Sequence, residues 1–214
     1  MMRLRTLGLA LVAAFAFSVV ASASALAVSP NWEKEEGKAF SVFTAATKVK
    51  SKTPSGKPLM LTDKKGGVFG ESVTLECEGT DEGTIGPEKK DEITAAKATS
   101  CKTAPGSGSC GSPSAEPVNL PWKTELFLSG TEIQDKLTAT TKSPGWKVIC
   151  NGFVEDTCEA TANLKMKNNF PNVEAEFFEK ETATCTRGGT KAGTVSGIDI
   201  TENPGGGIEA IRVN

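Results

Sequence analysis

Two short stretches of alternating apolar and polar residues, each ending in a cysteine, constrain the fold most strongly. Residues 73–77 read Val-Thr-Leu-Glu-Cys, and residues 146–150 read Trp-Lys-Val-Ile-Cys. Successive side chains of an extended strand point to opposite faces, so the first, third and fifth residues of each stretch share one face. The pattern therefore predicts two strands whose cysteines lie against a buried core.

Many other segments have the composition of strands, being rich in Val, Ile, Thr and Phe and separated by turns rich in Gly, Pro, Asn and Asp. Residues 92–97 alone would also suit a helical turn, because Ala favours helices. The last two strands, 194–201 and 208–213, are expected to form a hairpin around 202–207. We predict an all-β fold: an antiparallel β-sandwich of about a dozen short strands, cross-linked by disulfides and compatible with an internal duplication.

The amino terminus has the pattern of a secretory signal peptide. Arg3 and Arg5 precede the apolar run 7–20, and two small-x-small cleavage sites follow at 23–25 and 25–27. We assign 1–27 to the signal peptide, 28–38 to a flexible segment and 39–214 to one domain. The alternative is two small β modules, 39–105 and 118–214, joined by the Gly-, Ser- and Pro-rich segment 103–117.

The charge of the mature chain limits its partners. Cleavage after residue 27 removes two of the 24 basic side chains and leaves 22 against 26 acidic ones, a net charge of −4. A mildly acidic chain without a basic block argues against nucleic acid and anionic membranes as partners. The carboxyl end has no lipid signal or apolar anchor. The sequence predicts a secreted protein with an unknown extracellular or cell-envelope ligand and no stable membrane anchor.

Six cysteines lie in the mature part, an even number that in an exported chain indicates disulfides. Each of the two cysteine-ending strands is followed by a later segment that also ends in Cys, at 101 and at 185. This echo favours Cys77–Cys101 and Cys150–Cys185, which leaves Cys110–Cys158 to join the halves. Fifteen pairings are possible, and a local Cys101–Cys110 bridge is the main competitor.

Three segments carry a resemblance to a known group of proteins. They are Thr84-Ile85-Gly86 with Asp91-Glu92-Ile93-Thr94, the run 120–126 (Leu-Pro-Trp-Lys-Thr-Glu-Leu), and 145–150 (Gly-Trp-Lys-Val-Ile-Cys). With them the chain resembles a group of exported, disulfide-containing, β-rich proteins of actinobacteria, high-GC Gram-positive bacteria, whose function is unassigned. The resemblance covers most of the mature chain. It implies a secreted β protein and supplies no catalytic residues.

Two absences narrow the chemistry. The chain has no His and no Tyr, which removes Ser-His-Asp and Cys-His catalysis and zinc sites with His ligands. Residues 106–111 fit G-x-G-x-x-G, but a dinucleotide site needs a strand before the motif and a helix after it, and prolines flank it here. We predict no catalytic, cofactor-binding or metal-binding residues.

Carboxylates and tryptophans are the remaining candidates. Carboxylates occur in close sets, which we interpret as solvated faces, although two of them across a cleft would suit a glycosidase. No set matches a known calcium loop. The sets are Asp81 with Glu82, Asp91 with Glu92, Glu155 with Asp156, Glu174 with Glu176, and Glu179 with Glu181. Trp122 and Trp146 share faces with core residues, and only Trp32 lacks an apolar partner in the pattern.

These observations favour a secreted or envelope-associated, non-catalytic β protein, a binding or structural module. Two alternatives stay open. One is a secreted glycoside hydrolase that uses two carboxylates, which needs no His. The other is an extracellular protein-binding or inhibitor module, which predicts an exposed apolar patch.

Overall fold

The structure is a computed structural model that describes residues 29–138, 140–177 and 182–214, so the predicted signal peptide lies outside the described residues. Within these ranges the chain forms strands, and no described helix is long and apolar enough to cross a membrane. The strands are β1 (Trp32–Glu36), β2 (Ala39–Val42), β3 (Thr47–Lys52), β4 (Leu59–Asp63), β5 (Val73–Ile85), β6 (Lys90–Thr103), β7 (Ser114–Val118), β8 (Trp122–Ser129), β9 (Glu132–Thr138), β10 (Gly145–Cys150), β11 (Val154–Glu159), β12 (Ala162–Asn169), β13 (Asn172–Phe177), β14 (Thr182–Cys185), β15 (Gly189–Thr201) and β16 (Ala210–Val213).

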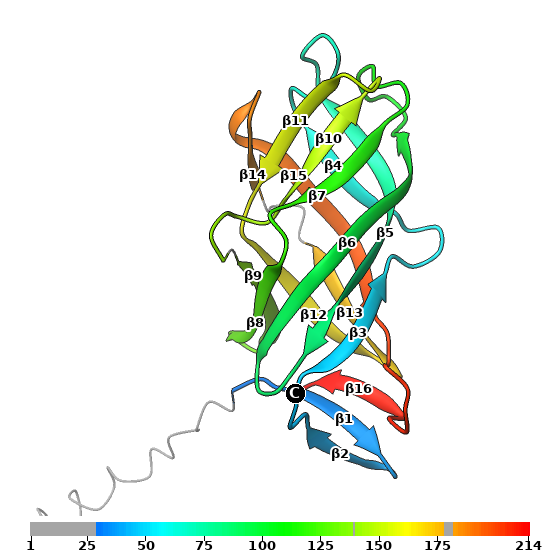
Figure 1. Cartoon of the computed structure of the whole chain (residues 1–214), viewed down its shortest axis with the longest axis vertical. Coiled ribbons are helices and arrows are strands. Elements are labelled where there is room, and N and C mark those ends of the chain that lie inside the picture. Colours follow the sequence, from blue (N-terminus) through cyan, green and yellow to red (C-terminus); the bar gives the residue numbers. More distant parts are fainter. Residues whose placement is uncertain (1–28, 139, 178–181) are drawn as a thin grey trace, which may run out of the picture.

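Eight strands form a closed ring in the lower part of the molecule as drawn in Figure 1. Their order is β13-β12-β9-β8-β6-β5-β3-β15, and β15 pairs again with β13. Every pairing in the ring is antiparallel. Closing a sheet on itself pairs backbone groups that an open edge would leave exposed. We call this ring, together with the small sheet below it, the lower half.

The longest strands extend above the ring and carry the rest of the sheet. β5, β6 and β15 have 13, 14 and 13 residues. Above the ring, β4 lies between β5 and β15, and β14, β11, β10 and β7 follow one another beyond β15. Figure 1 shows these five strands at the top of the molecule, and we call this region the upper half.

A small sheet of three strands, in the order β16-β1-β2, lies below the ring (Figure 1). Two predictions are wrong here. The segment 28–38 is not flexible throughout, because Trp32 is buried and Trp32–Glu36 pair with both β2 and β16. The last two strands form no hairpin, because β16 pairs with β1, where Ile211 and Val213 join the apolar core.

The alternation of the two cysteine-ending strands is confirmed. Val73, Leu75 and Cys77 are fully buried, and Val148 and Cys150 are buried on one face of β10. The all-β, antiparallel, disulfide-linked fold is confirmed as well, and residues 92–97 belong to strand β6. The two layers that face each other across the core belong to one sheet. This sheet curves round until β13 hydrogen-bonds to β15.

All six cysteines form disulfides, but two predicted pairings are wrong. Cys77–Cys101 is present, whereas Cys110 bonds to Cys150 and Cys158 bonds to Cys185. Cys158 and Cys185 face each other across neighbouring strands β11 and β14. Cys110 precedes β7, which pairs with β10 and so lies beside the end of β10 that carries Cys150. The repeat of cysteine-ending segments in the sequence does not show which strands are neighbours in the sheet. The disulfide pairing depends on which strands are neighbours.

The segment 103–117 is not a free linker between two modules. Residues 114–117 belong to β7, and the Gly108 amide donates a hydrogen bond to the carbonyl of Ser72. Strands on either side of the segment pair directly, β6 with β8 and β15 with β3 and β4. One continuous sheet therefore includes both parts of the chain.

Candidate functional site

Five of the eight described carboxylates that were singled out in the sequence lie on outward faces and pair with lysines. Measured from the ammonium nitrogen to the nearest carboxylate oxygen, these ion pairs are Lys50–Glu82 at 2.8 Å, Lys123–Glu92 at 2.8 Å, Lys147–Glu155 at 3.6 Å, Lys167–Glu174 at 3.7 Å and Lys167–Glu176 at 2.6 Å. Glu179 and Glu181 lie outside the described residues. These five glutamates lie on the solvated surface, as the alternation of polar and apolar residues along the strands predicted.

Asp81, Asp91 and Asp156 differ from those glutamates because they face the interior. Each precedes or follows an outward-facing Glu, so the two acids of each adjacent set point to opposite sides of a strand. Asp81 and Asp91 line one enclosed space, and Asp156 lies in the upper half. The structure therefore separates Asp156 from Asp81 and Glu82, and the three do not form a calcium site.

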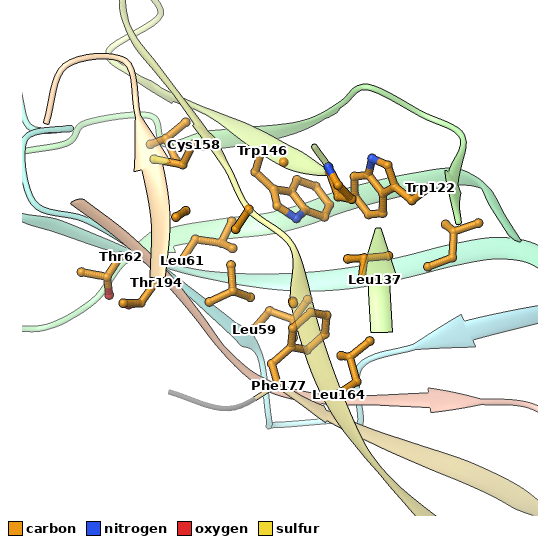
Figure 2. Close-up of a pocket in the computed structure, with 18 of the residues that line it drawn as sticks. Leu59, Leu61, Thr62, Trp122, Leu137, Trp146, Cys158, Leu164, Phe177 and Thr194 are labelled. Atoms are coloured by element: carbon orange, nitrogen blue, oxygen red, sulfur yellow. The ribbon is translucent and has the colours of Figure 1, made fainter. Parts of the chain in front are cut away.

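A largely apolar cavity of about 80 Å³ lies at the waist of the molecule, where strands of the two halves meet. Figure 2 shows its lining, which includes Leu59 and Leu61 of β4, Trp146 of β10 and Phe177 of β13. We call this space the waist cavity. Its position follows from the topology: β8, β10 and β12 begin here and β13 ends here, so their terminal side chains surround it.

Two tryptophans form one side of the waist cavity (Figure 2). The ring centroids of Trp122 and Trp146 are 5.8 Å apart, and the ring planes meet at 68°. The edge-to-face arrangement is a favourable one for aromatic pairs. The indole of Trp122 donates a hydrogen bond of 2.8 Å to the Val118 carbonyl, which fixes the ring. Trp32 is buried in the small lower sheet and does not line this cavity.

A second space of about 70 Å³ lies inside the ring and shares Asp81, Ile93, Leu164 and Phe177 with the waist cavity. We call it the acidic chamber, because four aspartates line it, one from each of four strands. They are Asp81 (β5), Asp91 (β6), Asp135 (β9) and Asp199 (β15). The described residues that line either space include no Lys or Arg. Four acids therefore face an interior that holds no basic side chain.

Asp81 and Asp199 form one pair of carboxyls. Asp81 is directly opposite Ser51 of β3, which is opposite Thr201 of β15, so these side chains share the inner face with Asp199. The two carboxyls interact, because each affects the pKa of the other. Burial raises the pKa of Asp81, and burial together with the neighbouring Asp81 raises the pKa of Asp199 well above its usual value.

Asp91 and Asp135 interact at the other side of the chamber. Burial raises the pKa of Asp91 to about 7, although its oxygens accept hydrogen bonds from the indole of Trp32 and the amide of Gly86. Burial and the charge of Asp91 raise the pKa of Asp135 to about 8. Within the described chain, the Oδ1 atom of Asp135 and the hydroxyl of Thr124 have no hydrogen-bond partner. Both residues are more than nine-tenths buried.

A third carboxyl pair, Asp63 and Asp156, lies in the upper half. The amide of Lys65 donates to Asp63 and the amide of Arg187 donates to Asp156, each over 2.9 Å. Burial raises the pKa of Asp63 to about 6, and the adjacent Asp156 contributes. The sulfurs of Cys158 and Cys185 lie within 4.8 Å of an Asp63 oxygen, but their disulfide prevents them from acting as thiolate metal ligands.

The Gly-rich segment 106–111 forms a loop packed on residues 67–72. The amide of Val68 donates to the carbonyl of Ser109, and the carboxylate of Glu71 accepts the Ser109 amide. No helix follows the loop, because β7 begins at Ser114. The context of a dinucleotide site is therefore missing.

Large exposed apolar side chains lie mainly in turns. Phe69 precedes β5, Phe153 lies between β10 and β11, and Phe170 lies between β12 and β13. Phe170 packs on Phe40, with ring centroids 5.8 Å apart. Phe69, Phe153 and Phe170 thus belong to three different connections.

Comparison with models of known protein families, with curated proteins and with solved structures found no match. The resemblance to exported actinobacterial proteins therefore stays a prediction. The geometry of the site is the basis for a functional proposal.

Three of the buried acids were missed in the sequence: Asp63, Asp135 and Asp199. A signal was present for two of them. Asp63 continues the inward face of Leu59 and Leu61, and Asp135 lies between Ile133 and Leu137 on one face of β9. An acid in register with buried apolar residues indicates a buried carboxyl, whereas closeness of two acids in the sequence does not.

Proposed function

We propose that the protein is a secreted, non-catalytic module that binds a small apolar molecule in the waist cavity. The single observation that carries the proposal is the apolar space between Trp122 and Trp146 on one side and Leu59, Leu61 and Phe177 on the other. Ligand sites in proteins are concave and mostly apolar, with a few polar groups that fix orientation. In this protein, Asp81 is the polar group at the border of the waist cavity.

The size of the cavity limits the ligand. Sites for drug-sized molecules measure roughly 300–1,000 Å³, whereas this cavity measures about 80 Å³. A single ring or a short alkyl chain is the largest molecule that we expect to fit without rearrangement. The pairing of all six cysteines supports secretion, because disulfides persist in oxidising compartments.

Tryptophan fluorescence tests the proposal, because two of the three tryptophans line the cavity. Titration with benzyl alcohol should change the emission and saturate. Ala162→Leu, which adds bulk to the cavity wall, should weaken binding at least tenfold. Ala95→Leu adds the same bulk at an exposed position of β6 and should leave binding unchanged. No saturable change in the native protein with either benzyl alcohol or benzylamine, or equal binding by the Ala162 and Ala95 variants, would contradict the proposal.

A glycoside hydrolase is the second candidate, favoured by one observation. Asp81 and Asp91 line the same space, and Asp91, with its pKa near 7, has the property of a general acid. Against it, the acidic chamber measures about 70 Å³ and lies inside the ring, whereas a polysaccharide needs an open groove. Release of reducing sugar from a cell-wall glycan by the native protein, with loss of that activity in Asp91→Asn, would establish this alternative.

A further inference from the structure

We propose that the ligand of the waist cavity is a small organic cation, whose apolar body lies among the tryptophans and whose ammonium group binds the Asp81–Asp199 pair. This inference rests on the proposed function and specifies the chemistry of the ligand. It follows from the way in which the two interior spaces meet.

The waist cavity and the acidic chamber are adjacent and share four lining residues, one of which is Asp81. The side chains around the waist cavity are mostly Leu, Trp, Phe, Val and Ala, and those around the chamber include four aspartates. The interior is therefore apolar at one end and acidic at the other. A molecule with an apolar body and one positive charge matches both ends.

The acids of the chamber have no basic partner. No Lys or Arg appears among the described lining residues, and Glu82 and Glu92, which also border the chamber, already pair with the outer lysines Lys50 and Lys123. A buried carboxylate without an opposite charge is costly, and without a ligand the pair lowers that cost by keeping a proton. An ammonium group would supply the missing charge.

A second observation concerns the hydrogen bonding of the chamber and includes Thr124, which is not one of the four aspartates. The Oδ1 atom of Asp135 and the hydroxyl of Thr124 line the chamber and have no hydrogen-bond partner within the described chain. Asp135 and Thr124 are 6% and 4% exposed. Buried polar atoms without partners are rare in folded proteins, and these two line the space that the ammonium group would enter. An amine has several N–H donors, enough for one carboxyl pair and a further acceptor.

The neighbouring side chains support the Asp81–Asp199 pair as the binding point. Ser51 and Thr201 lie beside it and are 3.3 Å apart, hydroxyl to hydroxyl. Asp199 accepts one hydrogen bond, from the amide of Ile200, whereas Asp91 already accepts two, from Trp32 and Gly86. Asp81 lines both spaces, so its pair with Asp199 is the acidic group that a ligand in the waist cavity reaches first.

Three probes with the same ring but different charge test the inference at pH 7: benzylamine, benzyl alcohol and benzoate. Binding is measured by calorimetry and by tryptophan fluorescence. We expect benzylamine to bind at least tenfold more tightly than benzyl alcohol, and benzoate to bind most weakly. If benzyl alcohol and benzylamine both fail to bind, the proposed function fails. If both bind with equal affinity, the apolar site stands and the cation inference is overturned.

A double variant, Asp81→Asn with Asp199→Asn, assigns the preference to these residues. It should reduce benzylamine binding at least tenfold and leave benzyl alcohol binding unchanged. Glu155→Gln is the control, because Glu155 pairs outward with Lys147 and lines neither space. It should keep the preference for the amine. Retention of the preference in the double variant would overturn the inference. The three-probe comparison in the native protein tests it without any substitution.

Discussion

The two halves of the molecule are stabilised in different ways. The upper half, together with the parts of β5 and β6 that extend above the ring, contains all three disulfides and a small core made mainly of Val, Leu, Ala and Cys, centred on Leu75 and Cys150. The lower half, without those parts of β5 and β6, contains no cysteine among the described residues, and its larger core includes Trp32, Trp122 and Leu126. In the lower half the strands close into a ring and bury large side chains, so the packing of the core stabilises the fold. In the upper half the core is small, and the disulfides add stability.

The two halves also differ in the number of buried acidic side chains. The lower half places four aspartates around one chamber, whereas the upper half has the single pair of Asp63 and Asp156. Buried acids destabilise a fold, and a small core tolerates few of them. The half with the larger core is therefore the one that tolerates the four buried acids.

The largest expected effect is on the upper half. In the chain-entropy treatment the Cys110–Cys150 bridge, with a sequence separation of 40 residues, contributes about 4 kcal/mol. Replacing both cysteines with alanine should lower the free energy of unfolding by about that amount, measured by urea denaturation. A loss below about 1 kcal/mol would break the comparison, because the upper half would then not depend on its bridges.

The next effect concerns the lower half and pH. The pKa of Asp91 is about 7 and that of Asp135 about 8 in the folded state, whereas an unfolded Asp titrates near 4. The folded state therefore binds more protons than the unfolded state between roughly pH 4 and 8. The free energy of unfolding should fall as pH rises through this range, by about 1 kcal/mol per pH unit for each such group.

Urea denaturation between pH 5 and 9 measures this slope. Asp135→Asn should flatten it and raise the stability at pH 8, because a neutral amide replaces the group that resists ionisation. Glu82→Gln, which alters an exposed acid, should leave the slope unchanged. A stability that rises from pH 5 to 8 would contradict the assignment of raised pKa values to these aspartates.

A smaller effect tests the contact between a bridge and a strand. A Cβ atom at Gly193 of β15 would lie 2.7 Å from the sulfur of Cys185 and 3.1 Å from that of Cys158. Gly193→Ala should therefore cost about 1–3 kcal/mol in unfolding free energy. In the background of Cys158→Ala with Cys185→Ala the cost should shrink, since the sulfurs are gone. An unchanged cost would show that the disulfide is not the obstacle.

The sequence allowed the fold class to be predicted because alternation is a local property. Leu75 and Val148 are buried as their register required, and all six cysteines are paired. The disulfide pairing depends on which strands become neighbours, as with β11 and β14. The pairing of β1 with β16 joins residues that are far apart in the chain. Such pairing is set by the closed topology and is not encoded in any single segment.

The candidate site was predicted only in part for a related reason. Trp122 and Trp146 were assigned to the core, and they do lie inside, but a small space remains beside them. Asp81 and Asp91 were recognised as candidates, while their partners Asp199 and Asp135 come from strands more than 40 residues away. A cavity is a property of how strand ends meet, and the pattern of one strand cannot show it.

Hydrogen exchange with and without saturating benzyl alcohol tests most directly the central claim that a ligand site lies where the two halves meet. We predict slower exchange in the segments that meet at the waist, namely the beginnings of β8, β10 and β12 and the end of β13. Protection of the upper loops around Phe69 and Phe153 alone, or no change at any amide, would contradict it.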